Sequence, residues 1–317
     1  MLRRLKHLPK KFKILLMQSA DKKAYLETLL KRAAPITPHH FAWHGHAINF
    51  DALRLDQLGH YVSGNKILKL GPELLTYLTE AGEGIPVATF GGARSHSLQA
   101  FSALARILRL NAMAFIRQSP TGAHERLVTR MQRRGVRVVE LSPEAYKFRE
   151  NEMFIDKLLA DYGEMFLIPE GASTPNAVNN IAVSLRKRLQ NYQHVFVSVG
   201  MGGTMAGCIK AVHNKDIHVH GISSVKADPS LPQRVRTLLN ETGVHNETCG
   251  WDIDYDFAGK GYGKISAELE DFKEAFETQT NITLDTTYTT KSAYAMWSQM
   301  KENDFKTVLW LQTLNAH

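Results

Sequence analysis

The sequence contains little cysteine and no long apolar stretch. Its two cysteines, Cys208 and Cys249, lie too far apart for a C-x-x-C pair or a metal-binding spacing. This usage excludes a disulfide framework, gives no indication of a metal site and is typical of the reducing cytosol. No apolar run approaches the roughly 18 residues that a membrane-spanning helix needs. We therefore expect a cytoplasmic protein with no membrane partner.

Internal repeats, low-complexity segments and a Pro/Gly/Ser-rich linker are also absent. The 317 residues are nevertheless enough to bury a sizeable core in one large domain or two modest ones. The hydrophobic content of 44% and the charged content of 22% are ordinary for a globular enzyme. Because no linker divides the chain, we expect any second domain to be inserted into the first rather than appended to it.

The net charge of +8 is concentrated at the start of the chain. A basic N-terminal arm, expected over residues 1–34, explains this charge better than a nucleic-acid-binding fold, because no base-reading module is visible. An organelle transit peptide is an alternative, since the segment before Asp21 is basic and free of acids, although Pro9 interrupts it. The early basic residues are Arg3, Arg4, Lys6, Lys10, Lys11 and Lys13.

From Pro86 onward, short apolar runs alternate with amphipathic segments of helical period, which predicts βαβ units and mostly parallel sheets. Helices are expected at 97–110, 176–190 and 290–302, whereas 243–287 is interpreted as ordered loops with short elements. The predicted strands cover 86–90, 111–116, 136–141, 165–169, 194–199, 217–222 and 306–311.

Two lysines follow a Gly-Asn pair in the segment YVSGNKILKLGPELLTYL. Gly64 and Asn65 lead into an amphipathic helix that begins near Lys66 and carries Lys69. The positive end of a helix dipole disfavours an ammonium group and thereby favours the neutral amine that imine formation requires. A surface lysine after a turn is the alternative interpretation.

The segment VSVGMGGTMAG predicts a strand, a glycine-rich turn and a helix, which together form a typical phosphate-binding cup. A dinucleotide fingerprint is excluded because Met205 stands where its third glycine belongs, and because no acid ends the strand at 217–222. A glycine-rich packing turn remains the alternative. The segment ATFGGARSHSLQAF repeats the strand-to-helix pattern, with Ser95 and His96 at the expected sheet edge and Ser95 also suited to capping the helix.

The motifs SGNK-x-x-K, GGA-x-S, PEGAS, VGMGGT, GYG and YT-x-KSAY resemble, in this order, those of the 1-aminocyclopropane-1-carboxylate deaminase and D-cysteine desulfhydrase family. The resemblance runs from about Arg54 to Thr313. It implies an α/β fold of the two-domain, tryptophan-synthase-β-like fold-type II of pyridoxal 5'-phosphate enzymes, with open, mostly parallel sheets that carry helices on both faces. The large cofactor-binding domain is expected at 35–69 and 166–317, the small domain at 70–165, and the assembly as a homodimer.

The resemblance also implies a role for each matching residue. Lys66 corresponds to the Schiff-base lysine and, once released, to the base, while Tyr262 and Tyr288 face the substrate. Ser95 corresponds to a serine near the substrate carboxylate, and Thr289 to the partner of the pyridine nitrogen. The cofactor-binding set is Asn65, Lys66, Lys69, His96, Gly200, Met201, Gly202, Gly203, Thr204, Thr289 and Thr313.

The implied function is α,β-elimination from a small amino acid by a pyridoxal phosphate-dependent lyase or deaminase. A D-cysteine desulfhydrase is favoured because threonines stand at 289 and 313, where ring-opening deaminases have glutamate and leucine. The alternatives are an aminocyclopropane-carboxylate deaminase and a non-catalytic pyridoxal phosphate-binding protein. Departures from the family pattern motivate the last alternative: Leu68 replaces an arginine, His96 an asparagine, and Leu314 and Asn315 two glycines.

Overall fold

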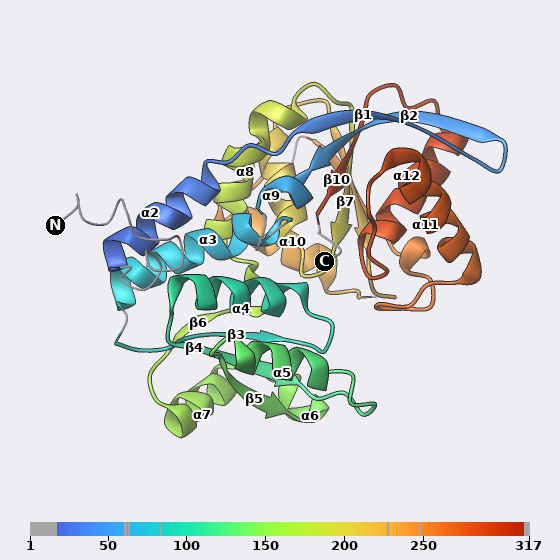
Figure 1. Cartoon of the computed structure of the whole chain (residues 1–317). Helices are drawn as coiled ribbons and strands as arrows, with labels where there is room; N and C mark the ends of the chain where they lie inside the picture. The colour runs from blue at the N-terminus through green and yellow to red at the C-terminus, as the bar shows by residue number, and fades with distance from the viewer. Residues whose placement is uncertain are drawn as a thin grey trace, which may run out of the picture. The chain divides into compact units, whose positions relative to one another are not determined.

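The computed structural model describes residues 18–59, 62, 64–82, 84–226, 228–246 and 249–313. They form two compact units, which are visible in Figure 1. The first unit contains the described residues up to Lys31 together with Leu70–Ala172, and the second contains Arg32–Lys69 and the residues from Ser173 onward. The basic segment 1–17 and the turn at 314–315 lie outside the described residues. The domain boundaries expected from the sequence stay a prediction.

The first unit is built on a four-stranded parallel sheet with the strand order β5-β4-β3-β6. Part of the segment expected as an arm forms its helix α2, in which Leu26 is fully buried. Aromatic and aliphatic side chains, among them Phe90 and Phe115, form the core against the sheet. Its elements are α2 (Ser19–Leu30), the π-helix η4 (Tyr77–Ala81), β3 (Val87–Gly91), α4 (His96–Leu108), β4 (Ala112–Arg117), α5 (Glu125–Arg133), β5 (Arg137–Leu141), α6 (Pro143–Tyr146), α7 (Glu152–Tyr162), β6 (Phe166–Ile168) and the 3-10 helix η5 (Glu170–Ala172).

The second unit is built on a six-stranded sheet with the order β1-β2-β10-β7-β8-β9. Only β1 is antiparallel to its neighbour in this sheet. Helix α3 (Lys66–Thr76) begins in this unit and continues into the first. The other elements are β1 (Ile36–Trp43), β2 (His46–Arg54), η3 (Leu55–Gln57), α8 (Pro175–Leu189), β7 (His194–Val199), α9 (Gly203–Val212), β8 (His218–Ser223), α10 (Leu231–Glu241), β9 (Gly250–Asp254), η6 (Asp256–Ala258), α11 (Ala267–Thr280), α12 (Thr289–Glu302) and β10 (Val308–Gln312).

The strand order fixes where a ligand is expected in the second unit. From β7 the chain continues to its neighbour β8 on one side, whereas β10, much later in the sequence, pairs with β7 on the other side. In open parallel sheets, ligands bind at the carboxyl ends of the strands where the direction of winding reverses. Gly200 follows β7 and Thr313 follows β10, so both of these predicted site residues lie at this switch point.

The structure confirms the α/β fold class and the mostly parallel sheets. The first six predicted strands agree with β3 to β8 to within one residue at each end, and the last overlaps β10. The hairpin of β1 and β2 was not predicted. The interpretation of 243–287 as loops is wrong for α11, because Ser266 caps this helix and Leu269, Phe272 and Phe276 form its buried face. Among the described residues, no helix combines the length and apolar character needed to cross a membrane.

A close contact between α8 and α9 fixes the helix that follows the glycine turn. Gly207 lies in α9 where an added Cβ would overlap the side chain of Ile181 and lie 3.3 Å from the Val178 carbonyl oxygen. We expect Gly207→Ala to lower the free energy of unfolding, because overpacking costs about 1–3 kcal/mol, whereas replacing a helical glycine gains at most about 1 kcal/mol.

Urea denaturation would measure this loss. Gly84→Ala is the matched control, because nothing lies within 4 Å of its added Cβ and its φ is not in the left-handed region. We expect this variant to be neutral or slightly more stable than the parent protein. Equal stability of the two variants would contradict the packing argument.

Candidate active site

The predicted phosphate cup lies between β7 and α9. Gly202 has a φ of 87° and occupies the N-cap of α9, which no side chain of the described residues caps. A Cβ at Gly202 would lie 2.9 Å from Val235 Cγ2, and one at Gly203 would lie 2.7 Å from Ser173 Oγ. Only glycine therefore fits at both positions. The first N–H groups of a helix have no partner within the helix, so this turn suits an anion.

Asn65 connects the predicted lysine to this cup. Lys66 is the first residue of α3, as the sequence predicted, and its Nζ donates a hydrogen bond to Asn65 Oδ1 at 2.6 Å. The amide nitrogen of Asn65 donates to Thr204 Oγ1 at 2.6 Å, and its backbone N–H donates to the Thr313 carbonyl oxygen at 2.9 Å. One buried residue thus joins the start of α3 to the first turn of α9 through its side chain, and to the residue after β10 through its backbone.

Lys69 is linked to the glycine turn through Ser173. Its Nζ donates to Ser173 Oγ at 3.0 Å, and this is the same serine that lies against Gly203. The side chain of Lys69 is buried. The amine is thereby held near the N-terminus of α9, as its predicted contact with a phosphate requires. Ser173 was not predicted as a site residue, although it lies in the motif PEGAS.

The two amines lack the ion pairs that usually accompany buried lysines. In the part of the chain that the structure describes, no carboxylate forms an ion pair with Lys66 or Lys69. Burial lowers the pKa of Lys66 from 10.5 to about 8, and the carboxylate of Asp285 opposes this shift. Burial lowers the pKa of Lys69 well below its usual value, and the charge of Lys66 acts in the same direction. An anionic group is the complement that this pair of amines lacks.

The two predicted tyrosines lie together beside the turn. The hydroxyl groups of Tyr262 and Tyr288 are 3.1 Å apart, and the Nζ of Lys66 lies 5.9 Å from the centroid of the Tyr288 ring. A Cβ on Gly200 would lie 3.3 Å from the Tyr288 hydroxyl oxygen. Two phenols within hydrogen-bonding distance of each other, one of them near a lysine amine, form a chain of groups able to pass a proton.

Lys291 fixes the loop that carries Tyr262. Its buried Nζ donates to the carbonyl oxygens of Ala258 and Gly261 at 2.7 Å, and to that of Ser224 at 3.2 Å. Burial lowers its pKa to about 8. The three carbonyls satisfy the buried amine, so Lys291 is a positioning residue. It was visible in the sequence only as part of the motif YT-x-KSAY.

Thr289 is bonded to a carboxylate that the sequence reasoning missed. Its hydroxyl donates to Asp285 Oδ2 at 2.7 Å and accepts the backbone N–H of Asp285 at 2.8 Å. Asp285 also accepts the backbone N–H groups of Thr287, Tyr288 and Thr289. The threonine hydroxyl is therefore oriented by Asp285, and its pairing with a pyridine nitrogen stays a prediction.

Two predicted site residues belong to the first unit. Ser95 caps α4, and its Oγ accepts the backbone N–H of Leu98 at 3.1 Å, as the capping interpretation predicted. His96 is the first residue of that helix. Both follow β3 at its carboxyl end, where ligands of parallel sheets bind. Leu68, which replaces an arginine of the family pattern, is buried in α3 of the second unit.

The sequence is similar to those of proteins named as 1-aminocyclopropane-1-carboxylate deaminases and D-cysteine desulfhydrases. No family model matches it. It is 29% identical to a putative 1-aminocyclopropane-1-carboxylate deaminase of Thermotoga maritima over 79% of this chain and 83% of the relative. It is 27% identical to a bifunctional D-cysteine desulfhydrase/1-aminocyclopropane-1-carboxylate deaminase, mitochondrial, of Arabidopsis thaliana over 79% of this chain and 67% of the relative.

A solved structure supports the same relationship at the level of the fold. The crystal structure of an ACC deaminase homologue matches with a TM-score of 0.74 at 21% identity, covering 92% of this chain and 94% of the other. The resemblance seen in the ordered motifs is confirmed by these matches. The chain is therefore related to the 1-aminocyclopropane-1-carboxylate deaminase and D-cysteine desulfhydrase family and has the fold-type II architecture of its pyridoxal phosphate enzymes.

Proposed function

We propose that this protein is a pyridoxal phosphate-dependent lyase that eliminates a β-substituent from a small amino acid, with D-cysteine as the favoured substrate. One observation carries the proposal. The amines of the partly buried Lys66 and the buried Lys69 lie beside the N-terminus of α9, and no carboxylate of the described residues forms an ion pair with either. A cofactor that offers both an aldehyde and a phosphate complements this arrangement.

The residues fit the cofactor at each of its ends. Gly202, Gly203 and the N-terminus of α9 would hold the phosphate with backbone N–H groups. The bound anion would oppose the burial that lowers the pKa of Lys69 and would keep this amine protonated as its counter-charge. Lys66 would carry the cofactor, because its amine lies beside Asn65 and near Tyr288, and its pKa of about 8 leaves part of the amine neutral near physiological pH. When bound, the cofactor supplies an electron sink for the bond that breaks at Cα.

The protein itself would supply the proton transfers. We assign the removal of the Cα proton to Lys66, the amine that lies between Asn65 and the tyrosines. Tyr288 and Tyr262 would polarise or protonate the leaving group through their mutual contact. Ser95, in the first unit, is proposed to bind the substrate carboxylate. We further propose that the protein works as a homodimer in the cytoplasm.

The choice between two substrates depends on Thr289 and Thr313. A carboxylate at the position of Thr289 would hold a proton on the pyridine nitrogen and deepen the sink that ring opening needs, whereas a thiolate is already a competent leaving group. The names of the relatives favour a 1-aminocyclopropane-1-carboxylate deaminase as the second candidate. A side-by-side assay separates the two.

We expect D-cysteine to yield sulfide, pyruvate and ammonia, with kcat/KM at least about tenfold above that for aminocyclopropane carboxylate, which corresponds to about 1.4 kcal/mol in barrier height. Sulfide and 2-oxobutanoate would be quantified in parallel on one preparation. Faster ring opening would contradict the threonine argument. Turnover of neither substrate, despite bound cofactor, would favour a non-catalytic role.

The affinity for cofactor should depend on the glycine turn more than on the neighbouring hydroxyl. Gly202→Val puts a β-branched residue at a φ of 87° and against Val235, so we expect at least about a tenfold loss of pyridoxal phosphate affinity. Thr204→Val removes one hydrogen bond to Asn65 and should cost about fivefold, or about 1 kcal/mol. Titration followed by visible absorbance measures both. A larger effect at Thr204 would place the phosphate elsewhere.

The pH dependence of cofactor capture should follow the pKa of Lys66. The neutral amine rises from about a tenth of the population at pH 7 to about nine tenths at pH 9, so the rate at which apoprotein and pyridoxal phosphate develop colour should rise with a midpoint near 8. Asp285→Asn removes the carboxylate that raises this pKa, and should move the midpoint to lower pH.

Asp304→Asn, at an exposed side chain, is the matched control and should leave the midpoint unchanged. An upward movement of the midpoint in Asp285→Asn would show that the sign of the coupling is wrong. A midpoint near 10.5 in the parent protein would show that the capturing amine is not the buried Lys66.

A further inference from the structure

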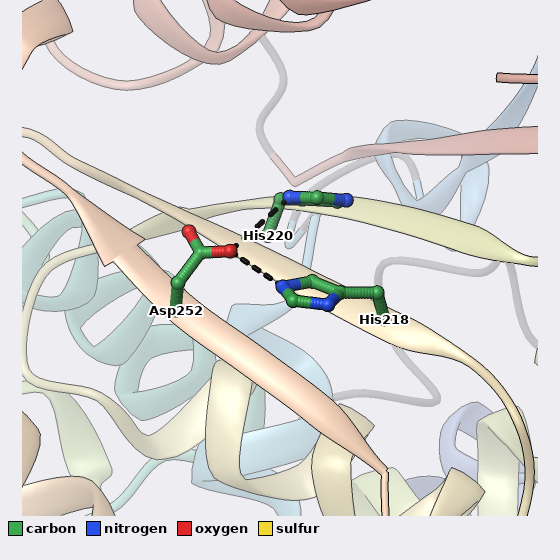
Figure 2. Close-up of side chains that lie close together, drawn as sticks. All are labelled: His218, His220 and Asp252. Carbon is green, nitrogen blue, oxygen red and sulfur yellow. Dashed lines mark hydrogen bonds and ion pairs between the residues drawn. The ribbon is translucent and has the colours of Figure 1, made fainter. Parts of the chain in front are cut away.

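Three potential metal ligands converge near the amino ends of β8 and β9. Figure 2 shows the imidazole of His218 reaching toward the carboxylate of Asp252, and a dashed line that joins the same carboxylate to the nearer ring nitrogen of His220. Asp252 Oδ2 lies 2.5 Å from His218 Nε2 and 3.4 Å from His220 Nδ1. One ligand atom from each residue lies within 4.8 Å of the other two. In the described part of the chain, no other group of three or more His, Cys, Asp and Glu side chains has this geometry.

The sheet produces this convergence through its register. His218 and His220 are two residues apart on β8, so their side chains share a face, and His220 pairs with Asp252 of the adjacent parallel strand. His218 pairs with Gly250, where an added Cβ would lie 2.5 Å from His218 Nδ1. The glycine therefore leaves the space that the ring of His218 occupies.

The distances suit a small divalent ion. Ligands about 2.0–2.1 Å from a tetrahedral zinc ion lie about 3.3 Å from one another, close to the 3.4 Å between Asp252 Oδ2 and His220 Nδ1. The 2.5 Å distance between Asp252 Oδ2 and His218 Nε2 has to lengthen by less than about 1 Å to reach this separation between ligands. The side chains of His218 and Asp252 are 37% and 47% exposed, so an ion reaches them from solvent and a water molecule can complete the coordination.

A neighbouring histidine orients His220. The Nε2 of His220 is 3.0 Å from His194 Nδ1, the ring of Phe196 stacks on that of His220, and the ring of Phe305 lies tilted to it at 5.6 Å. This contact occupies the nitrogen that faces away from Asp252 and leaves Nδ1 directed at the carboxylate. Ligating histidines in metal sites usually have their second nitrogen held in this way.

The cluster is separate from the site described above. His218 pairs with His194 and His220 with Phe196 of β7, so roughly 13–20 Å of strand separate the cluster from the level of Gly200, which follows β7. β9 is an edge strand of the sheet and pairs only with β8. An ion bound by His218, His220 and Asp252 would therefore stabilise the pairing of β9 with β8.

We propose that His218, His220 and Asp252 bind one divalent transition-metal ion, with zinc as the best match to two imidazoles and one carboxylate, and that the ion fastens β9 to β8. Calcium and magnesium are disfavoured because they prefer all-oxygen ligand sets. The site does not depend on the identity of the substrate or on Lys66. Failure of the proposed function therefore leaves this inference intact, and the reverse is also true.

Calorimetric titration of the holoenzyme with zinc chloride tests the proposal. We expect one zinc ion per chain and a higher thermal midpoint when zinc is added. His218→Ala and Asp252→Asn should each lower the affinity by roughly tenfold or more, remove the zinc-dependent rise in the midpoint, and leave the cofactor absorbance and turnover unchanged. His40→Ala is the matched control at an exposed histidine of β1 and should bind zinc like the parent protein.

X-ray absorption of the zinc-loaded parent protein keeps the test decisive if a variant fails to fold. The proposal predicts a first shell of nitrogen and oxygen with two imidazoles and no sulfur, in agreement with the burial of both cysteines. A sulfur shell, no saturable binding, or unchanged affinity in His218→Ala would overturn it.

Discussion

The hydrogen bonds of Asn65 are the constraint on which the proposed active site depends. This buried side chain accepts from the amine of Lys66 and donates to Thr204, while its backbone donates to Thr313. The start of α3, the N-terminus of α9 and the end of β10 are thereby fixed to one another. A lysine amine free to move would lose its rotamer entropy when it reacts, whereas this one is already ordered at the glycine turn. The site is preorganised by the side-chain amide and the backbone N–H of one residue.

The electrostatics of the second unit follow from the same arrangement. Lys66 and Lys69 lie close enough for the charge of Lys66 to lower the pKa of Lys69, and the carboxylate that acts on Lys66, that of Asp285, is engaged by backbone N–H groups and by Thr289. The amines therefore remain without an ion pair and suit an anionic ligand that also needs a nucleophile. The buried amine of Lys291 differs from these two, because it donates hydrogen bonds to three backbone carbonyl oxygens. The same residue type thus has either a chemical or a structural role, according to its partners.

Much of the fold was predictable because buried parallel strands and amphipathic helices leave periodic patterns, and the resemblance of ordered motifs located Lys66 and the glycine turn. The hairpin of β1 and β2 was not predicted because its strands carry few continuous apolar residues. Helix α11 was not predicted because its many acidic residues conceal the spacing of Leu269, Phe272 and Phe276. Ser173 and Asp285 could not be predicted from local sequence, since their roles arise from contacts with Lys69 and Thr289. The cluster of His218, His220 and Asp252 needed the register of β8 and β9, which the sequence alone does not give.

The central claim is that Lys66, rather than Lys69, carries the cofactor. Its most direct test is borohydride reduction of the protein loaded with pyridoxal phosphate, followed by peptide mapping. The account predicts a pyridoxyl group on Lys66, and predicts that Lys66→Ala loses the label while Lys69→Ala retains it at lower occupancy. A label on Lys69 in the parent protein, or no label on either lysine, would contradict the account.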